Sequence, residues 1–300
     1  MPVSRLSFVA LVLLSAVWGY SWVFLKLGLL DAGPFTFAGL RTFLGGICLL
    51  ATLPLTGRPF RLERGKEVLL LGLITTTASV GCSQMALVSG AANRTSILMF
   101  TMPFITLLLA WPALGEKVRG AQWFAIASAA AGLLAVVQPW SAHGQLLSQG
   151  LILCAALFWS VSAILTKRML ARAPMDLLSM TAWQMTLGSI ALLAIAWGSN
   201  EPSPIWTPRF ALALTATGVI STGLGWYLWA WLLNRLPAGM ASMMTLMVPV
   251  IAVTSTSLQL GEPLAAGDLL GMALIVLGLV VLSWQAIARH RANLVGAAPE

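Results

Sequence analysis

Long apolar stretches alternate with short polar connections along almost the whole chain. Ten of these stretches are roughly 20 residues long and end at Gly, Pro or charged residues, and an α-helix needs this length to cross a bilayer. We therefore predict an all-α integral membrane protein with ten transmembrane helices. The predicted spans are residues 7–28, 35–53, 67–87, 93–113, 120–138, 148–168, 178–198, 210–232, 238–258 and 267–288.

The segments outside these spans are short. The connections are mostly 5 to 13 residues long, which leaves no room for a soluble domain. The first apolar run, residues 6–30, is longer than the apolar core of a signal peptide, so we interpret it as a retained helix. Residues 289–300 are predicted to be a disordered tail.

Composition agrees with a location in the bilayer. Hydrophobic residues make up 59% of the chain and charged residues 9%, and the mean hydropathy is +0.90, whereas about a quarter of the residues of a soluble domain are charged. A net charge of +8 is also found in nucleic-acid-binding proteins. Here the basic residues are scattered and form no patch, so we expect no nucleic-acid partner. Cys48, Cys82 and Cys154 lack metal-ligand spacing and lie in apolar runs, which indicates packing residues.

The second half of the chain repeats the first. Residues 92–136 align without a gap with residues 238–282 at an offset of 146 residues. Each repeat, 1–138 and 148–288, contains five predicted helices. Because five is an odd number, the second repeat must cross the membrane in the opposite sense, and such inverted repeats are typical of transporters. The aligned pairs include Pro103 with Pro249, Gly115-Glu116 with Gly261-Glu262, and Gly132-Leu133 with Gly278-Leu279.

Lys and Arg are concentrated on one side of the predicted membrane. If the N-terminus is inside, the cytoplasmic segments hold thirteen of these residues and the other side holds two, Arg94 and Arg209, apart from Lys26 and Arg41 near the outer ends of their helices. Connections rich in Lys and Arg stay in the cytoplasm. We therefore predict that both termini are cytoplasmic in a multi-pass protein of the cell inner membrane.

The first helices of the two repeats are also alike. The sequence WGYSWVFLK at residues 18–26 corresponds to WSVSAILTK at 159–167, and LGGICLL at 44–50 corresponds to LGSIALL at 187–193. With these motifs and the paired Pro and Gly-Glu positions, the chain resembles the EamA-type members of the drug/metabolite transporter superfamily. The resemblance implies ten helices in two EamA repeats and the export of small metabolites. The chain looks most like the bacterial branch that exports amino acids, including aromatic ones.

Two prolines lie about ten residues into their predicted helices. Pro103 and Pro249 each remove a backbone hydrogen bond, which frees the carbonyls of Met99 and Thr245. In lipid such a carbonyl must face protein or a water-filled cavity. A purely structural kink and a cavity lining are equally good explanations, and the symmetric placement favours the cavity. The serines Ser96 and Ser242 are expected beside these breaks.

Two tryptophans occupy equivalent positions near the middle of predicted helices. Trp18 and Trp159 are each followed three residues later by a serine on the same face, Ser21 or Ser162. An indole at this depth needs a partner for its N–H or a ligand to stack on. A packed core tryptophan and a cavity wall remain alternatives. Tyr227 adds a further candidate for an aromatic face.

Few charged or amide side chains lie inside the predicted spans: Lys26, Arg41, Gln84 and Gln184. Lys26 is close enough to its helix end to reach the membrane surface. Arg41 aligns with Gln184, and an ionisable residue inside a span is a functional candidate by default. Because an Arg at this place is common in the family that the chain resembles, the resemblance favours a structural hydrogen bond to backbone carbonyls over a ligand contact. Gln84 and Gln184 are candidates for binding a polar solute or for joining helices. Glu116 and Glu262 are interpreted as loop and cap residues.

The middle of every predicted span lacks Asp and Glu. This argues against a cation–proton antiporter, and it favours a facilitator that follows the substrate gradient. No nucleophile-base pair, metal cluster or phosphate loop indicates an enzyme, a cofactor or a metal. The expected partners are a small-molecule substrate and membrane lipid, with the chain as a monomer or weak homodimer. Two alternatives stay open: an exporter of nucleosides, sugar derivatives or cations, and a membrane scaffold that does not transport.

Overall fold

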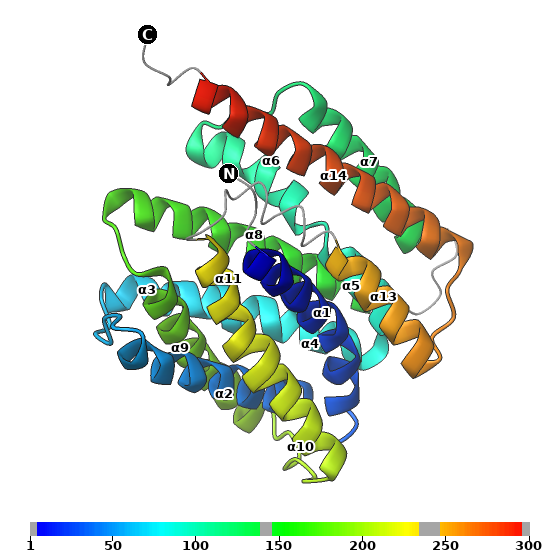
Figure 1. The fold of residues 1–300 in the computed structure, drawn as a ribbon. Coiled ribbons are helices and arrows are strands. Elements are labelled where there is room, and N and C mark those ends of the chain that lie inside the picture. The colour runs from blue at the N-terminus through cyan, green and yellow to red at the C-terminus, as the bar shows by residue number, and fades with distance from the viewer. Residues whose placement is uncertain (1–4, 139–145, 234–246, 296–300) are drawn as a thin grey trace.

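The computed structural model describes residues 5–138, 146–233 and 247–295, and these segments form helices joined by short connections, without a strand among them (Figure 1). Eight helical segments in these ranges are long and apolar enough to cross a membrane, and two further apolar helices are shorter. The all-α prediction is therefore confirmed. The count of ten spans remains a prediction, because one of the shorter helices borders residues 234–246.

Where the structure describes them, the helix ends lie close to the predicted span boundaries, with one exception; the predicted start at residue 238 lies outside the described residues. The last helix continues to Val295, so the disordered tail predicted from residue 289 is wrong up to this residue. No Gly or Pro occurs between Gly278 and Gly296, so no local signal ends the helix at residue 288. The elements are α1 (Arg5–Gly28), α2 (Pro34–Leu55), α3 (Gly65–Gly72), η1 (Leu73–Val80), α4 (Gly81–Ser89), α5 (Ala92–Met99), α6 (Met102–Leu114), α7 (Ala121–Val137), α8 (Leu146–Arg172), α9 (Leu177–Gly198), α10 (Pro208–Thr215), η2 (Ala216–Leu224), α11 (Gly225–Leu233), α13 (Met247–Leu260) and α14 (Ala266–Val295).

The two halves of the chain pack in mirrored pairs. Helix α2 packs against α9, and each of the two also packs against one π-helical segment, α2 against η2 and α9 against η1. In the same way α1 packs against α13, and α8 packs against α5 and α6. Helices α7 and α14 pack against each other at one edge of the bundle (Figure 1). Exchanging the halves leaves this pattern unchanged, as expected for two copies of one unit.

Two segments, η1 and η2, are π-helical, with a turn wider than that of an α-helix. Each lies in the middle of a long helix, between α3 and α4 in the first half and between α10 and α11 in the second. In η2 the Gly225 N–H donates to the carbonyl of Ile220, five residues back. Such turns often occur at functional sites. The sequence did not predict them.

Small residues bring some helices very close together. A Cβ at Gly72 would lie 2.5 Å from the carbonyl oxygen of Gln184, and one at Gly188 would lie 2.5 Å from the carbonyl oxygen of Gly72. Gly132 and Gly271 allow a similar approach of α7 to α14. Contacts of this kind are typical of helix pairs in membranes, where small residues let backbones meet.

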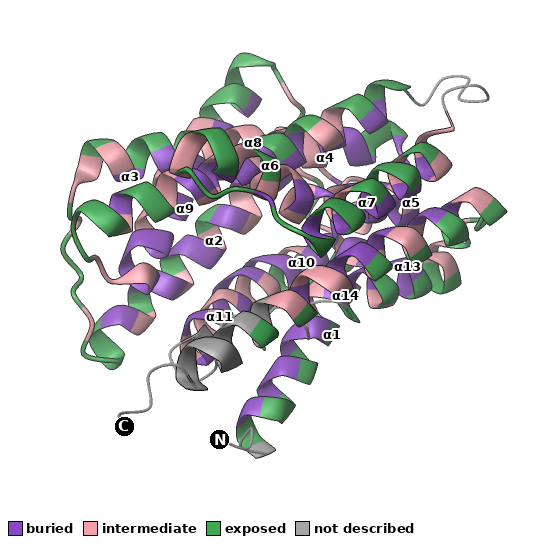
Figure 2. Cartoon of the chain, turned by 90° about the horizontal axis from the view of Figure 1, so that it is seen from above, coloured by how far each residue is buried: buried purple, intermediate pink, exposed green. Residues whose placement is uncertain are grey.

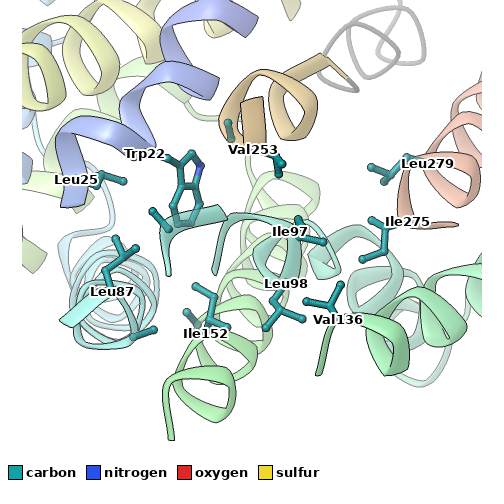
Figure 3. Packing of buried hydrophobic residues seen from close by; sticks show 14 of the residues in the cluster. Trp22, Leu25, Leu87, Ile97, Leu98, Val136, Ile152, Val253, Ile275 and Leu279 are labelled. Atoms are coloured by element: carbon teal, nitrogen blue, oxygen red, sulfur yellow. The ribbon is translucent and has the colours of Figure 1, made fainter. Parts of the chain in front are cut away.

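The main apolar core lies where several helices meet. Figure 3 shows part of it, with Trp22 of α1, Leu87 of α4 and Ile152 of α8 among its members. Buried residues lie where helices face one another, and exposed residues cover the outside of the bundle (Figure 2). Many exposed side chains are large and apolar, as expected for a surface in contact with lipid. Trp197, at the end of α9, is 84% exposed, as suits a tryptophan at the membrane boundary.

Candidate functional site

A tryptophan of α11 contacts one tryptophan of α1 and one of α8. The ring of Trp226 lies 5.8 Å from that of Trp18 and 5.9 Å from that of Trp159, measured between centroids. Trp229 also contacts Trp18, at 5.8 Å. All four rings keep part of their surface accessible. We call these four residues the tryptophan cluster, and it joins the two repeat-equivalent tryptophans that the sequence singled out.

The indole of Trp18 is held by the π-helical segment η2. Its Nε1 donates to the carbonyl oxygen of Ser221 at 3.1 Å. A side chain at Gly225 is incompatible with this arrangement, because its Cβ would lie 2.5 Å from Trp18 Nε1. The wide turn and the adjacent glycine therefore place a backbone acceptor where a helix of another repeat can reach it. This contact satisfies the indole N–H of Trp18.

The two predicted Trp-Ser pairs have the same local geometry. The Ser21 hydroxyl donates to the carbonyl of Trp18, and the Ser162 hydroxyl donates to the carbonyl of Trp159, both at 2.7 Å. Each hydroxyl thus completes a hydrogen bond within its own helix. Both remain candidates for binding a ligand, because a hydroxyl oxygen that donates keeps its lone pairs as acceptors.

A pocket of about 260 Å³ lies between α1 and η2, and none of the four tryptophans lines it. Its walls are mostly apolar, and its accessible polar surface is small. The volume is slightly below the roughly 300 Å³ of the smallest common ligand sites, so the pocket fits part of a small molecule. The lining residues are Ala16, Val17, Tyr20, Ser21, Phe24, Ala216 and Ile220.

A helix break occurs next to Pro103. Helix α5 ends at Met99 and α6 begins at Met102, so the proline lies in the first turn of α6, where its missing N–H is tolerated. The carbonyl of Met102 accepts a hydrogen bond from Ser160 of α8 at 2.9 Å. The break therefore contacts protein, as the cost of a free carbonyl in lipid requires.

The remaining residues beside the two breaks are only partly described. The Ser96 hydroxyl donates to the carbonyl of Asn93 at 2.7 Å, and Met99 packs against the main core. Pro249 is buried in the first turn of α13. Ser242 and Thr245 lie outside the described residues.

The two amides and the tyrosine have different kinds of contact. Gln84 is fully buried, and its Nε2 donates to the carbonyl of Leu25 at 3.0 Å, while its Oε1 has no hydrogen-bond partner among the described residues. The buried Oε1 of Gln184 also lacks a partner there. Tyr227 packs against leucines of α2 and α9, as Trp226 of the tryptophan cluster also does.

Trp226 was not predicted as a site residue. It belongs to the aromatic run WYLWAW at residues 226–231, from which Tyr227 was selected. The run itself is the signal, since three tryptophans in six residues are unusual in a transmembrane span. Which of its rings faces the interior depends on the helix phase after η2, and the sequence gives no sign of the π-helical turn.

Charged residues link the helix ends on one side of the bundle through ion pairs and hydrogen bonds. We call this side, where Asp31, Gly90, Glu201 and Glu262 lie, the Asp31 end. Arg209 makes a two-pronged ion pair with Asp31, with Nε and Nη2 at 2.8 and 2.7 Å from the carboxylate oxygens. These hydrogen bonds are the main reason why the pKa of Asp31 is below its usual value. Glu201 accepts hydrogen bonds from the first amides of α2 at 2.8 and 3.0 Å.

The two Gly-Glu pairs mark helix ends, as predicted. Gly115 and Gly261 have φ angles of 71° and 66°, in the left-handed region that suits glycine after a helix. Glu262 accepts hydrogen bonds from the amides of Ala92 and Asn93, both at 2.7 Å, and so caps α5 of the other half. Glu116 forms an ion pair with Lys167.

Known proteins resemble the chain along most of its length. The uncharacterized transporter YoaV of Bacillus subtilis (strain 168) is 29% identical over 269 residues, covering 88% of this chain and 91% of that protein. A probable amino-acid metabolite efflux pump of Escherichia coli (strain K12) is 27% identical over 289 residues, covering 93% and 95%. The equivalent pump of Salmonella typhimurium (strain LT2) is 26% identical over 300 residues, covering 95% and 97%.

The fold is also known. A protein of known crystal structure matches with a TM-score of 0.62 and 20% sequence identity, over 91% of this chain and 98% of that one. The EamA-like transporter family matches residues 6–138 and again residues 147–284. These two matches cover nearly the whole sequence, once in each half. The chain therefore belongs to the EamA-like transporter family.

Proposed function

We propose that this chain exports small metabolites across the cell inner membrane, most readily amino acids with large apolar or aromatic side chains. The observation that carries this proposal is the tryptophan cluster, in which Trp226 joins Trp18 of one repeat to Trp159 of the other. A site shared by both halves suits alternating access, in which the repeats move against each other around the substrate.

The chemistry of the cluster suits such a substrate. A zwitterion within the bilayer needs donors and acceptors for its charged ends and an apolar wall for its side chain. Partly accessible indole rings supply that wall, and aromatic pairs add about 0.5–1.5 kcal/mol beyond the area that they bury. The names of the Escherichia coli and Salmonella typhimurium relatives, which refer to amino-acid metabolite efflux, support the same substrate class.

We further propose that transport is facilitative. Every Asp and Glu of the sequence lies outside the middle of the predicted spans, and several of these carboxylates are engaged in ion pairs or helix caps at the helix ends. Without a carboxylate at membrane depth, the usual group for proton coupling is missing. The charge distribution of the connections supports a membrane orientation with both termini in the cytoplasm.

Counterflow in proteoliposomes tests this function. Liposomes loaded with unlabelled tryptophan should take up labelled tryptophan without any pH or sodium gradient. In the Trp226→Ala variant, exchange of tryptophan and leucine should fall by more than exchange of alanine and serine, because stacking area is lost while polar contacts remain. The matched control is Trp197→Ala, which removes a ring that is 84% exposed, and it should leave both rates unchanged.

Three results would contradict parts of the proposal. Equal losses for all amino acids in Trp226→Ala would indicate a structural tryptophan. Absence of amino-acid exchange in the wild type would refute the substrate class. A proton gradient that alone concentrates tryptophan many-fold would refute facilitated transport, and Glu116 and Glu262 would then be the first coupling groups to test.

A further inference from the structure

Arg41 is a cation at membrane depth without a counter-charge among the described residues. It lies seven residues from the start of α2, or roughly 10 Å along the helix axis. Its side chain is enclosed by protein but keeps some accessible surface. The buried Nε has no hydrogen-bond partner in the described segments, and no ion pair of Arg41 occurs there. The backbone carbonyls expected to hold this guanidinium are therefore not in contact with it.

Cations near the helix ends, unlike Arg41, have hydrogen-bond or ion-pair partners among the described residues. Lys26 Nζ donates to the carbonyls of Leu87 and Gly90 at 2.5 and 2.8 Å. Arg94 and Arg209 form ion pairs with buried aspartates, at 2.8 and 2.7 Å. Leaving a buried charge without a partner is strongly unfavourable, so proteins pair such groups or reserve them for a ligand. The unpaired state of Arg41 thus indicates a ligand that brings its own negative charge.

The part of α2 that carries Arg41 packs on η2, the segment that also contacts the tryptophan cluster. Its backbone carbonyl is 3.0 Å from the position that a Cβ at Gly218 would take, so this part of α2 packs on η2. The same segment η2 accepts the Trp18 hydrogen bond through Ser221. Trp18 lies ten residues from its helix end at Gly28, roughly 15 Å deep, so the two residues differ in depth by only about 5 Å. The backbone at Arg41 and the indole of Trp18 therefore contact η2 from different helices at similar depth.

We propose that Arg41 binds the carboxylate of the transported molecule. This inference rests on the proposed function and narrows it to substrates that carry a carboxylate. A guanidinium presents two parallel N–H groups that match the two oxygens of a carboxylate, and such charge-assisted pairs are about twice as strong as neutral hydrogen bonds. The equivalent position in the second repeat is the neutral Gln184, so only the first repeat supplies the charge. The substrate is bound with its anionic end towards α2.

The test compares two ligands that differ only in the carboxylate. Tryptophan and tryptophanamide share the indole and the amino group, and the amide lacks the negative charge. In wild-type proteoliposomes, tryptophan should compete with labelled tryptophan more strongly than the amide does. In Arg41→Gln, the apparent affinity for tryptophan should fall roughly 10- to 100-fold, the loss expected for a hydrogen-bonded charged group, while that for the amide stays unchanged. In this variant the apparent affinities for tryptophan and tryptophanamide should be nearly equal.

Further variants separate binding from folding. Glutamine is already accommodated at the equivalent Gln184, which makes Arg41→Gln a conservative choice, and size-exclusion profiles check that it folds. Arg41→Lys keeps the charge and should retain part of the preference for tryptophan, even if Arg41→Gln proves unstable. Arg172→Gln removes an exposed cation outside the predicted spans and should have no effect. A preference for tryptophan that survives in Arg41→Gln, or equal losses for both ligands, would overturn the proposal.

A binding measurement distinguishes this inference from the proposed function. If the wild type exchanges no amino acid, the proposed function fails, and Arg41 is then tested by the melting temperatures of the wild type and Arg41→Gln with a panel of small carboxylates. A rise in melting temperature with a carboxylate in the wild type alone supports an anion site at Arg41. No rise with any carboxylate, or the same rise in both proteins, refutes it.

Discussion

Replacing Glu262 with Gln should loosen the Asp31 end of the bundle. The two carboxylate oxygens accept hydrogen bonds from the amides of Ala92 and Asn93, both at 2.7 Å. A glutamine keeps one acceptor and loses the negative charge at the start of α5. Loss of a cap costs about 0.5–2 kcal/mol, and loss of a charge beside a helix N-terminus costs about 0.3–1 kcal/mol. We expect a total near 1.4 kcal/mol, which corresponds to about tenfold in the equilibrium between joined and separated helix ends.

Cysteine accessibility measures this change. Ala92 is fully buried, so a cysteine there, in a chain whose three native cysteines are replaced, should react slowly with a membrane-impermeant maleimide. Glu262→Gln should raise its labelling rate about tenfold and lower the melting temperature. Glu63→Gln, which changes an exposed glutamate elsewhere in the chain, is the control. Unchanged labelling together with an unchanged melting temperature would refute the argument that this cap holds the two halves together.

Three further predictions concern orientation, pH and packing. A single cysteine in the 139–147 connection should label from outside, whereas one between the second and third predicted spans should label only from inside; cytoplasmic labelling of the former would refute the inverted repeat. Arg209 lowers the pKa of Asp31 below its ordinary value of 3.8. The stability that this ion pair contributes is therefore present above pH 3.8 and is lost as the pH falls through the lower pKa of the folded protein. The melting temperature should be lower at pH 3 than at pH 6, and Asp31→Asn should remove the part of this difference that comes from the pair. Gly188→Ala should destabilise the protein by about 1–3 kcal/mol in unfolding measurements, whereas Gly150→Ala, where a Cβ meets nothing within 4 Å, should not.

The sequence predicts most helix boundaries because their causes are local. Apolar length defines a span, and Gly, Pro or charge ends it. The Gly-Glu pairs at Gly115 and Gly261 show this well, since a left-handed residue after a helix has a strong preference for glycine. The tail was placed wrongly for the same reason, because a helix with no such signal continues into a polar segment until Val295.

The membership of the candidate site depends on geometry that the sequence does not show. A π-helical turn accommodates extra backbone, and each inserted residue rotates the following helix by about 100°. The residues of η1 and η2 have no composition that distinguishes them from α-helix. With the phase changed, Trp226 contacts the rings of Trp18 and Trp159, while Trp226 and Tyr227 both pack against leucines of α2 and α9. The sequence also does not show that Glu262 of one half caps a helix of the other half, because the residues that meet there are far apart in sequence.

The paired π-helical segments also bear on the history of the chain. Both halves carry the wide turn in the middle of their third helix, so it was most simply already present in the ancestral five-helix protein whose gene duplicated. Since then, small insertions and deletions have accumulated around it: Trp18 matches Trp159 at an offset of 141 residues, whereas Pro103 matches Pro249 at 146. Flanking segments have changed length while the wide turn has been retained in both descendants.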